Sequence, residues 1–272
     1  MTDTFMGVGA PSEASEVVVL GAALSTVYPQ RHPHATNGPM ALRAASRRLA
    51  FFAGNYDFDT DGPFATWLGR VGDGGDVNTA RADAEGNRRR ITSAIAEVLG
   101  RGAMPLLLGG DDSVAEPFVA GWRDRGPVTV VHIDADLDFR DAVAGEAHGY
   151  ISPMRRASEM SWVRRVIHIG PRGVGSARAS DVQDTLEAGN AIVRLAGCLA
   201  PDLQETVLGA DGEGAAIGSP GQGDRCPGKA QQLHRLGAVV SCILHTPEVE
   251  TLVGGGRQAF TVRCPRHRQH LT

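Results

Sequence analysis

Short apolar runs rich in β-branched residues alternate with helical patterns along this chain, and this alternation constrains the fold most strongly. Ile91, Ile95 and Val98 share one face of a helix predicted over 79–99, and a second helix is predicted over 40–50. Strands this apolar are typical of a parallel sheet buried on both faces. The pattern therefore predicts an α/β protein, a three-layer α/β/α sandwich with a mainly parallel central sheet. The expected strands are 17–24, 104–108, 128–133, 166–169, 206–208 and 239–244.

Length and composition indicate one domain of ordinary size. The chain has 272 residues, of which 42% are hydrophobic, and this suffices for a sizeable core. The formal net charge of -4 argues against binding to nucleic acid or to an anionic membrane surface. No apolar run approaches the roughly 18 to 20 residues that span a bilayer, and the N-terminus lacks the features of a signal peptide. We expect a cytoplasmic protein that acts on a small molecule.

The two ends of the chain differ in composition from its middle. Residues 1–16 are small and polar, and we expect them to be poorly ordered. The domain is expected to span 17–262, and 263–272 reads as a basic tail. The four cysteines all lie in the last part of the chain without a CxxC spacing, which argues against a zinc knuckle or a disulfide scaffold.

The segment 130–138 is the strongest local signal for chemistry. An apolar strand runs directly into Asp134, Asp136 and Asp138, which are spaced two residues apart. Alternate residues of a strand share a face, so we expect the three carboxylates to converge at the carboxyl edge of the sheet. Like charges held that close need a cation, and oxygen donors suit Mn²⁺, Mg²⁺ or Ca²⁺. The alternative is that these aspartates only cap a helix or solvate a loop.

Two neighbouring segments favour a site over that alternative. Asp111 and Asp112 follow the strand predicted at 104–108, so they belong to an equivalent sheet edge, although one of the pair could simply cap the next helix. Downstream, His148 precedes Gly149 on a loop where an imidazole could act as general acid or base.

Together these segments resemble the ureohydrolases, the family of arginase, agmatinase, guanidinobutyrase and proclavaminate amidinohydrolase. The resemblance rests on Gly-Gly-Asp-Asp-Ser at 109–113, His-Ile-Asp-Ala-Asp-Leu-Asp at 132–138 and His-Gly at 148–149. The segments 152–160 and 169–176, with Gly-Pro at 38–39 and Leu-Arg at 42–43, are similar to the agmatinase-like branch. The resemblance covers about 17–197 and implies an arginase-like fold.

The resemblance also implies an activity and a set of residues. The family hydrolyses linear guanidino compounds, here agmatine-like, to urea and an amine through a metal-bound hydroxide at two Mn²⁺ ions. His148 would be the proton-shuttling residue, and a homo-oligomer is expected. The implied metal ligands are Asp112, Asp134, Asp136, Asp138 and Asp211. Candidates for recognising the far end of the substrate are Asp141, Glu146, Arg155 and Arg156.

Several positions depart from the family pattern. Asp112 and Asp136 stand where the family has histidine, and Asp211 belongs to a third motif of which little survives. In the best register, Gly209 replaces a bridging aspartate and Leu244 replaces a glutamate that helps hold the guanidinium group. The region after 197 is either eroded in frame or the product of a reading-frame change. The alternative function is therefore a catalytically silent homologue that binds a metal or a partner subunit.

Overall fold

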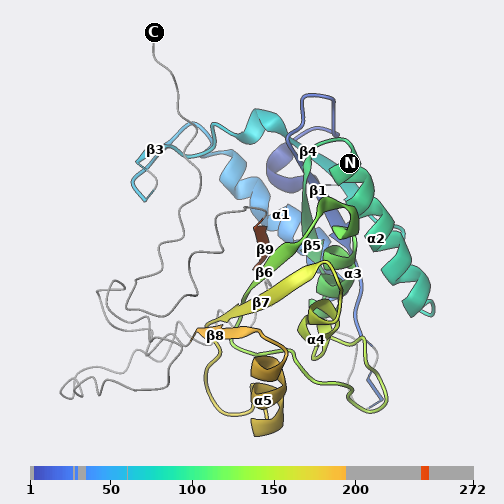
Figure 1. Ribbon diagram of the computed structural model, residues 1–272. Coiled ribbons are helices and arrows are strands. Elements are labelled where there is room, and N and C mark those ends of the chain that lie inside the picture. Colours follow the sequence, from blue (N-terminus) through green and yellow to red (C-terminus); the bar gives the residue numbers. More distant parts are fainter. Residues whose placement is uncertain (1–2, 27, 30–34, 60, 194–239, 245–272) are drawn as a thin grey trace, which may run out of the picture.

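The computed structural model describes residues 3–26, 28–29, 35–59, 61–193 and 240–244 (Figure 1). The strands are β1 (Val17–Ala22), β2 (Tyr56–Asp57), β3 (Gly62–Pro63), β4 (Val71–Asp76), β5 (Met104–Gly109), β6 (Val128–Ile133), β7 (Val163–Ile169), β8 (Ala191–Val193) and β9 (Val240–Leu244). The helices are α1 (Gly38–Ala50), α2 (Ala84–Gly100), α3 (Ala115–Ala120), α4 (Pro153–Ser158) and α5 (Ala179–Glu187), with short 3₁₀ turns between them.

The strands form two groups in which nearly all neighbours are parallel. One group has the order β4-β1-β5, and the other has the order β8-β7-β6-β9, while β2 and β3 form a separate small hairpin. Within these two groups, as far as the structure describes them, β9 alone runs antiparallel to its neighbour, pairing Val240 with Ile133 and Leu244 with Thr129 of β6. The mainly parallel α/β architecture predicted from the sequence is confirmed.

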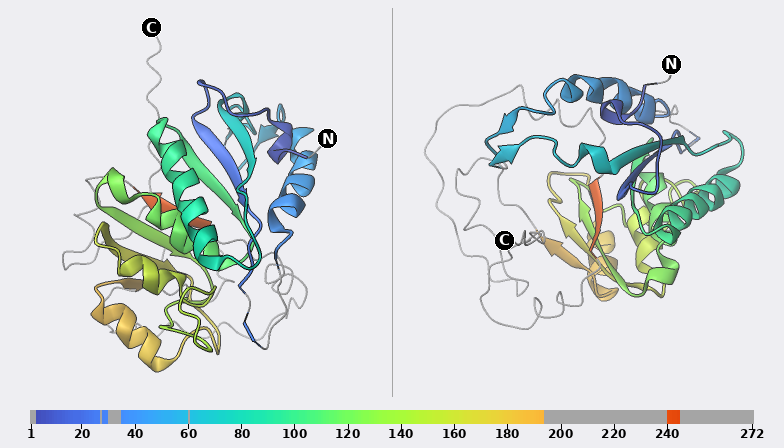
Figure 2. Two further views of the ribbon diagram at one scale, coloured as in Figure 1. Left: turned by 90° about the vertical axis from the view of Figure 1, so that its right-hand side faces the viewer. Right: turned by 90° about the horizontal axis from the view of Figure 1, so that it is seen from above.

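Helices cover both faces of the first strand group, because β1 is apolar at every position and buries side chains on both sides. Val18 and Leu20 pack with Ile91 and Ile95 of α2 in the larger core cluster. Val19 points to the opposite face and belongs to a smaller cluster that Leu42 of α1 and Leu68 pack against. The views in Figure 2 show α1 and α2 on opposite sides of these strands. The larger core continues through α3 and α4 onto β6 and β7.

Several element boundaries differ from those expected. The first strand ends at Ala22, two residues early, and β7 begins at Val163 rather than at 166. The long helix begins at Ala84, where Asp83 caps it by accepting a hydrogen bond from the Gly86 backbone N–H at 3.0 Å. The strands β4 and β8 were not expected from the sequence. The strand predicted at 206–208 and the tail 263–272 lie outside the described residues.

The described part of the N-terminal segment, 3–16, packs against the domain, whereas poor order was expected for 1–16. Met6 and Val8 are buried, and the Phe5 backbone N–H donates a hydrogen bond of 2.7 Å to Asp73 of β4. Arg43 of α1 donates two hydrogen bonds to the same carboxylate, from Nε to Oδ2 at 2.7 Å and from Nη2 to Oδ1 at 2.9 Å. A few apolar side chains and one buried ion pair therefore hold the segment 5–8 against the domain.

Burial alone would raise the pKa of the Asp73 carboxyl. Hydrogen bonds from Arg43 and from the backbone N–H groups of Phe5 and Gly75 outweigh that effect and lower the pKa below its ordinary value. Arg43 also pairs with Asp76, so this cluster joins α1, β4 and the N-terminal segment.

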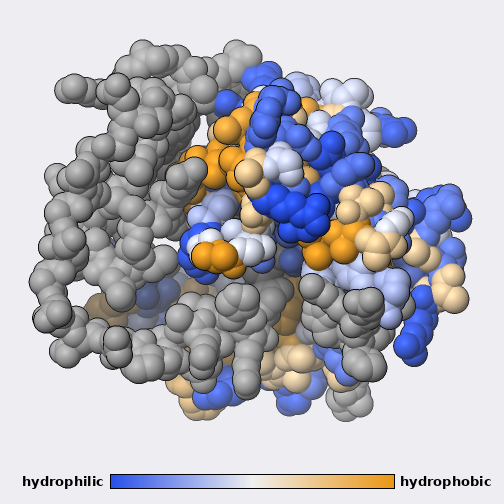
Figure 3. Space-filling model, turned by 90° about the horizontal axis from the view of Figure 1, so that it is seen from below, coloured by the Kyte–Doolittle hydropathy of each residue, from blue (hydrophilic) through white to orange (hydrophobic). Residues whose placement is uncertain are grey.

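Parts of the surface are apolar. Met104 and Leu106 of β5 are exposed, as are Phe51 and Phe58 near the β2–β3 hairpin. A space-filling view from below shows apolar groups at the surface between hydrophilic ones (Figure 3). None of the helices in the described part of the chain is both long and apolar enough to cross a membrane.

Candidate metal centre

A histidine and two aspartates meet just after β6. His132 Nε2 lies 3.6 Å from Asp138 Oδ2 and 3.9 Å from Asp134 Oδ2, and one ligand atom from each residue lies within 4.8 Å of the others. His132 and Asp138 are buried, and Asp134 is partly buried. The distances are too long for direct hydrogen bonds but suit donors that surround a common cation.

The aspartates come together by a turn rather than by the strand alternation expected from the sequence. The strand ends at Ile133, and the Asp134 carboxylate accepts a hydrogen bond from the Asp136 backbone N–H at 3.0 Å. Asp138 then has a φ of 50°, in the left-handed region that aspartate tolerates better than most residues. The chain therefore turns after β6 and brings the Asp138 carboxylate back towards His132.

Asp112 adds charge to this cluster from the end of β5. Burial, together with the neighbouring charges of Asp134, Asp111 and Asp136, raises its pKa to about 8. The pKa of Asp138 is likewise raised well above its ordinary value, first by burial and then by Asp112, Asp134 and Asp136. Carboxylates from two strand ends therefore repel one another at one buried point.

His132 contacts His168 of β7, its partner in the register of the parallel strands β6 and β7. The two Nδ1 atoms are 3.1 Å apart, and burial lowers the pKa of His132 to about 4 and that of His168 to about 3. Both rings are therefore neutral at neutral pH, and one Nδ1 must donate while the other accepts. If His132 donates, its Nε2 keeps a lone pair directed at the two carboxylates.

The residues present fit a divalent cation. His132 Nε2 and Asp138 Oδ2 are buried and have no hydrogen-bond partner among the described residues, which is a costly arrangement unless another group satisfies them. Carboxylate oxygens with one imidazole nitrogen are a donor set suited to Mn²⁺ and similar ions. Asp134, Asp138, Asp112 and His132 are the residues that could hold the ion.

This electrostatic arrangement gives metal-free protein an unusual pH dependence. A carboxyl whose pKa is raised in the folded state contributes stability below its unfolded pKa and loses it as pH rises through the folded value. For Asp112 we expect the free energy of unfolding to fall by about 1–2 kcal/mol between pH 6.5 and 8, from about 1.4 kcal/mol per pKa unit. Urea titrations of chelator-treated protein would measure this fall.

Below about pH 6.5 the buried histidines have the opposite effect on the free energy of unfolding, because the unfolded chain takes up protons that the folded chain does not. The comparison is therefore confined to about pH 6.5–8. Asp112→Asn is expected to flatten the slope, and Mn²⁺ added at pH 8 to restore the lost stability. A metal-free protein equally stable at pH 6.5 and 8 would contradict the raised pKa.

Asp111 and Asp112, which follow β5, have different roles. The Asp111 carboxylate accepts hydrogen bonds from the Ser113 backbone N–H at 3.1 Å and from the Thr26 backbone N–H at 2.6 Å. Gly110 lies so close to the segment after β1 that a Cβ would stand 1.7 Å from the Leu24 carbonyl oxygen. Asp111 is thus the capping member of the pair, and Asp112 is the one that joins the carboxylate cluster.

His148 lies on the loop between β6 and α4, beside α3. Its Nδ1 contacts both carboxylate oxygens of Glu116, at 2.9 and 3.0 Å. Its backbone N–H donates to Glu146 at 2.7 Å, and a Cβ at Gly149 would come within 2.1 Å of the Tyr28 hydroxyl. The imidazole is therefore fixed on one side, while its side chain remains 37% exposed.

The tip of the same loop is a tight turn closed by hydrogen bonds between Val143 and Glu146. Its central residues Ala144 and Gly145 both have positive φ, at 52° and 84°, as in a type I′ turn.

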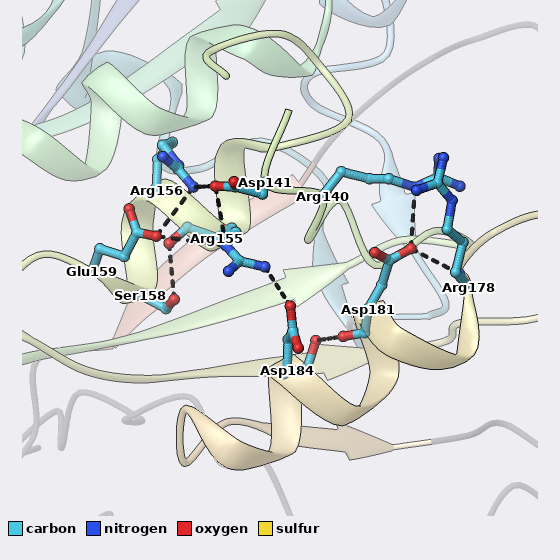
Figure 4. Close-up of polar contacts among 10 residues, drawn as sticks. Arg140, Asp141, Arg155, Arg156, Ser158, Glu159, Arg178, Asp181 and Asp184 are labelled. Carbon is cyan, nitrogen blue, oxygen red and sulfur yellow. Dashed lines mark hydrogen bonds and ion pairs between the residues drawn. The ribbon is translucent and has the colours of Figure 1, made fainter. Parts of the chain in front are cut away.

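The candidate substrate residues Asp141, Arg155 and Arg156 are paired with one another. Asp141 lies 2.8 Å from Arg156 and 3.6 Å from Arg155, while Arg155 also donates to Asp184 of α5 at 2.6 Å (Figure 4). The Asp141 side chain is 75% exposed. These charges join α4 to α5, whereas Glu146 is the candidate that directly contacts the His148 backbone. Asp211 lies outside the described residues.

Two residues of this region were not among the candidates from sequence. His132 falls on the core-facing side of a strand and is indistinguishable there from a buried structural histidine. Glu116 is a single glutamate in a six-residue helix. A histidine two residues before Asp134 is the available signal for the first, and no local pattern signals the second.

The fold and the cluster define an α/β protein with an acidic, imidazole-containing site at the carboxyl edge of a parallel sheet. The arginase family model matches residues 15–203, well over half of the chain. The protein therefore belongs to the arginase family.

Its relatives include enzymes that act on guanidino compounds. The chain is 33% identical over 166 residues to the mitochondrial agmatinase of Gallus gallus, covering 60% of this chain and 47% of that protein. It is 32% identical over 165 residues to the mitochondrial guanidino acid hydrolase of Homo sapiens, covering 59% and 45%. The chain thus spans about half the length of the curated relatives it matches.

Solved structures support the same fold. Proclavaminate amidino hydrolase from Streptomyces clavuligerus matches with a TM-score of 0.58 and 26% identity, covering 71% of this chain and 63% of that one. A Trypanosoma cruzi formiminoglutamase with Mn²⁺ matches with a TM-score of 0.60 and 21% identity, covering 72% and 66%. The arginase-like fold expected from the sequence is confirmed.

Proposed function

We propose that this protein hydrolyses a linear guanidino compound, agmatine-like, to urea and an amine with the help of a divalent cation. The observation that carries this proposal is the convergence of His132 Nε2 with the carboxylates of Asp134 and Asp138 after β6. Membership of the arginase family and the similarity to an agmatinase and a guanidino acid hydrolase support the choice of substrate class.

The cation is proposed to be Mn²⁺, held by Asp112, Asp134 and Asp138 with His132. Asp136, whose charge acts on Asp112 and Asp138, and Asp211 are proposed as further ligands for a second ion. When bound, a divalent cation would supply an acidified water molecule and stabilise the negative charge that develops during attack on the guanidinium carbon. The surrounding carboxylates would also attract the positively charged guanidinium group.

His148 is proposed to give a proton to the departing amine. Its Nδ1 is occupied by Glu116, so Nε2 is the atom available to hold or release that proton. Glu146, on the same loop, is the candidate that best suits recognition of the far end of the substrate. Asp141 and Arg155 would need to exchange their mutual ion pair for a substrate contact.

Replacing His148 by alanine tests whether this residue serves proton transfer rather than metal binding. We expect His148→Ala to lower urea release by about 100-fold, a typical contribution of general acid–base catalysis, with the manganese content unchanged. Colorimetric urea assays and elemental analysis of the same preparation would measure both quantities. A variant that loses its metal together with its activity would show that His148 has a different role.

The proposal as a whole is tested by loading the full chain with Mn²⁺, desalting it and counting the ions per chain. Urea release would then be assayed with agmatine, 4-guanidinobutyrate and arginine. Metal retention with urea release from any of the three supports the proposal. Metal retention without urea from any of them contradicts hydrolysis of guanidino compounds by this chain.

One structural observation favours the alternative, a catalytically silent homologue. Because β9 is antiparallel to β6, Leu244 pairs with Thr129, at the opposite end of β6 from Asp134. Ile133 is four residue steps along the strand from Thr129, or roughly 13 Å at about 3.3 Å per residue. The position where the family has a guanidinium-binding glutamate therefore lies far from the carboxylate cluster. A chain that binds one ion or none and releases no urea would support this alternative.

A further inference from the structure

Glu116 and His148 form a side-chain pair between two elements that are far apart in sequence. Glu116 belongs to α3, which follows the loop carrying Asp112, and His148 belongs to the loop after β6. The Glu116 side chain is only 13% exposed, and both of its oxygens lie within 3.0 Å of His148 Nδ1. Burying a carboxylate is costly unless it is paired, so this contact accounts for the position of Glu116 inside the fold.

The contact determines where the imidazole proton lies. A carboxylate only accepts hydrogen bonds, so the Nδ1 that faces it must carry a hydrogen. In the neutral ring, Nε2 then holds the lone pair, and in the protonated ring Nε2 carries the proton that can leave. In other proteins, a carboxylate that contacts one ring nitrogen of a histidine fixes its tautomer and ring orientation in this way.

The rest of the loop keeps His148 in place for this contact. The His148 and Tyr150 backbone N–H groups donate to Glu146 and to the Thr26 hydroxyl, at 2.7 and 3.2 Å. In the described part of the chain, the charged groups in hydrogen-bond contact with His148 are therefore Glu116 from α3 and Glu146 from its own loop. Among the described residues, the hydrogen bond from His148 to Glu146 comes from the backbone, whereas Glu116 contacts the ring.

We propose that Glu116 is a positioning residue that holds His148 in the Nδ1–H form and so leaves Nε2 as the nitrogen that can take part in proton transfer. The assignment rests on the proposed function for its consequence in turnover, whereas the state of the imidazole can be measured without it. Glu116 would act through His148 and would not itself contact the substrate or the metal.

The experiment compares the full-length wild type with Glu116→Gln, Glu116→Ala and a matched control, Glu187→Gln. Glu187 ends α5 and pairs with Gln183 in an exposed contact. Nitrogen-15 NMR of the metal-free proteins, at a pH where imidazole is neutral, reports which ring nitrogen of His148 carries the hydrogen. His148→Ala identifies the signal. We expect the Nδ1–H form in the wild type and the control, and a mixture of both forms in Glu116→Ala.

Kinetics give a second readout on Mn²⁺-loaded proteins. We expect Glu116→Gln to lower kcat by about 10- to 100-fold, the usual cost of removing a partner that orients a functional histidine, with KM changed less than threefold and metal content unchanged. Glu116→Asp should recover part of the rate because it restores the charge. Unchanged ring signals in Glu116→Ala would overturn the proposal, as would an unchanged kcat in a Glu116→Gln protein that releases urea.

Failure of the proposed function would look different. If no protein, including the wild type, releases urea, yet the His148 ring changes form in Glu116→Ala, the activity proposal fails and the pairing of Glu116 with His148 is supported.

Discussion

Asp138→Asn is expected to abolish metal retention and urea release while making the metal-free protein more stable at pH 8. The Asp138 carboxylate is buried, one of its oxygens has no hydrogen-bond partner in the described residues, and its pKa is raised by burial and by three neighbouring carboxylates. Asparagine keeps the shape and tolerates the positive φ at this position. It removes one repelling charge and, with it, an anionic ligand.

The expected loss of Mn²⁺ affinity exceeds about 100-fold, since changes to residues that merely support ligands already cost about 10- to 100-fold. Calorimetric titration with Mn²⁺ and urea-induced unfolding at pH 8 would be run on the same preparation. Asp124→Asn, which changes an exposed aspartate after α3, is the matched control and should leave both quantities unchanged. Wild-type Mn²⁺ affinity in Asp138→Asn would exclude this cluster as the metal site.

Arg43→Met is expected to give the largest loss of stability. The Arg43 and Asp73 side chains are 7% and 1% exposed, so the substitution leaves a buried carboxylate without its cation. Breaking a buried pair in this way typically costs about 3–5 kcal/mol. The free energy of unfolding, measured by urea denaturation at pH 7, should fall by that amount.

Arg47→Met provides the comparison one turn further along α1. Arg47 is 65% exposed and pairs with Asp3 at the surface, so we expect a change below about 1 kcal/mol. Because the pKa of Asp73 is lowered, the wild-type pair should lose its contribution only as pH falls through that lowered value. Equal effects of the two substitutions at pH 7 would contradict a special role for the buried pair.

Strands that are continuous apolar runs can be predicted from the sequence. Strands of polar or glycine-rich composition cannot, because they are stabilised by contacts with neighbouring elements. β5, β6 and α1 are found within one or two residues of their expected bounds, because their apolar pattern matches their burial. β4 consists of Val-Gly-Asp-Gly-Gly-Asp, a composition typical of loops, and it is a strand because it pairs with β1 and holds Arg43. Its assignment requires knowledge of its partners.

The candidate site shows the same division. Asp134, Asp138 and Asp112 can be selected from sequence because acidic residues that follow apolar strands meet at one sheet edge. The approach of His132 to Asp138 could not be predicted from sequence, because it depends on the positive φ at Asp138 and on the contact with His168 of β7. The pairing of Glu116 with His148 joins positions 32 apart and has no signature in either segment.

The loop that carries His148 has a firmly anchored part and a nearly independent tip, and this division bears on how substrate range could evolve. Residues 148–152 are tied to Thr26, Tyr28 and Glu116, whereas the turn at 143–146 closes mainly on itself. Exchanges at Ala144 and Gly145 keep the hydrogen bond from the His148 backbone to Glu146, so they would change the tip of the loop without moving the imidazole. If the chain hydrolyses guanidino compounds as proposed, substitutions of different size and charge between Val143 and Glu146 are accordingly a way to change which of these compounds it accepts.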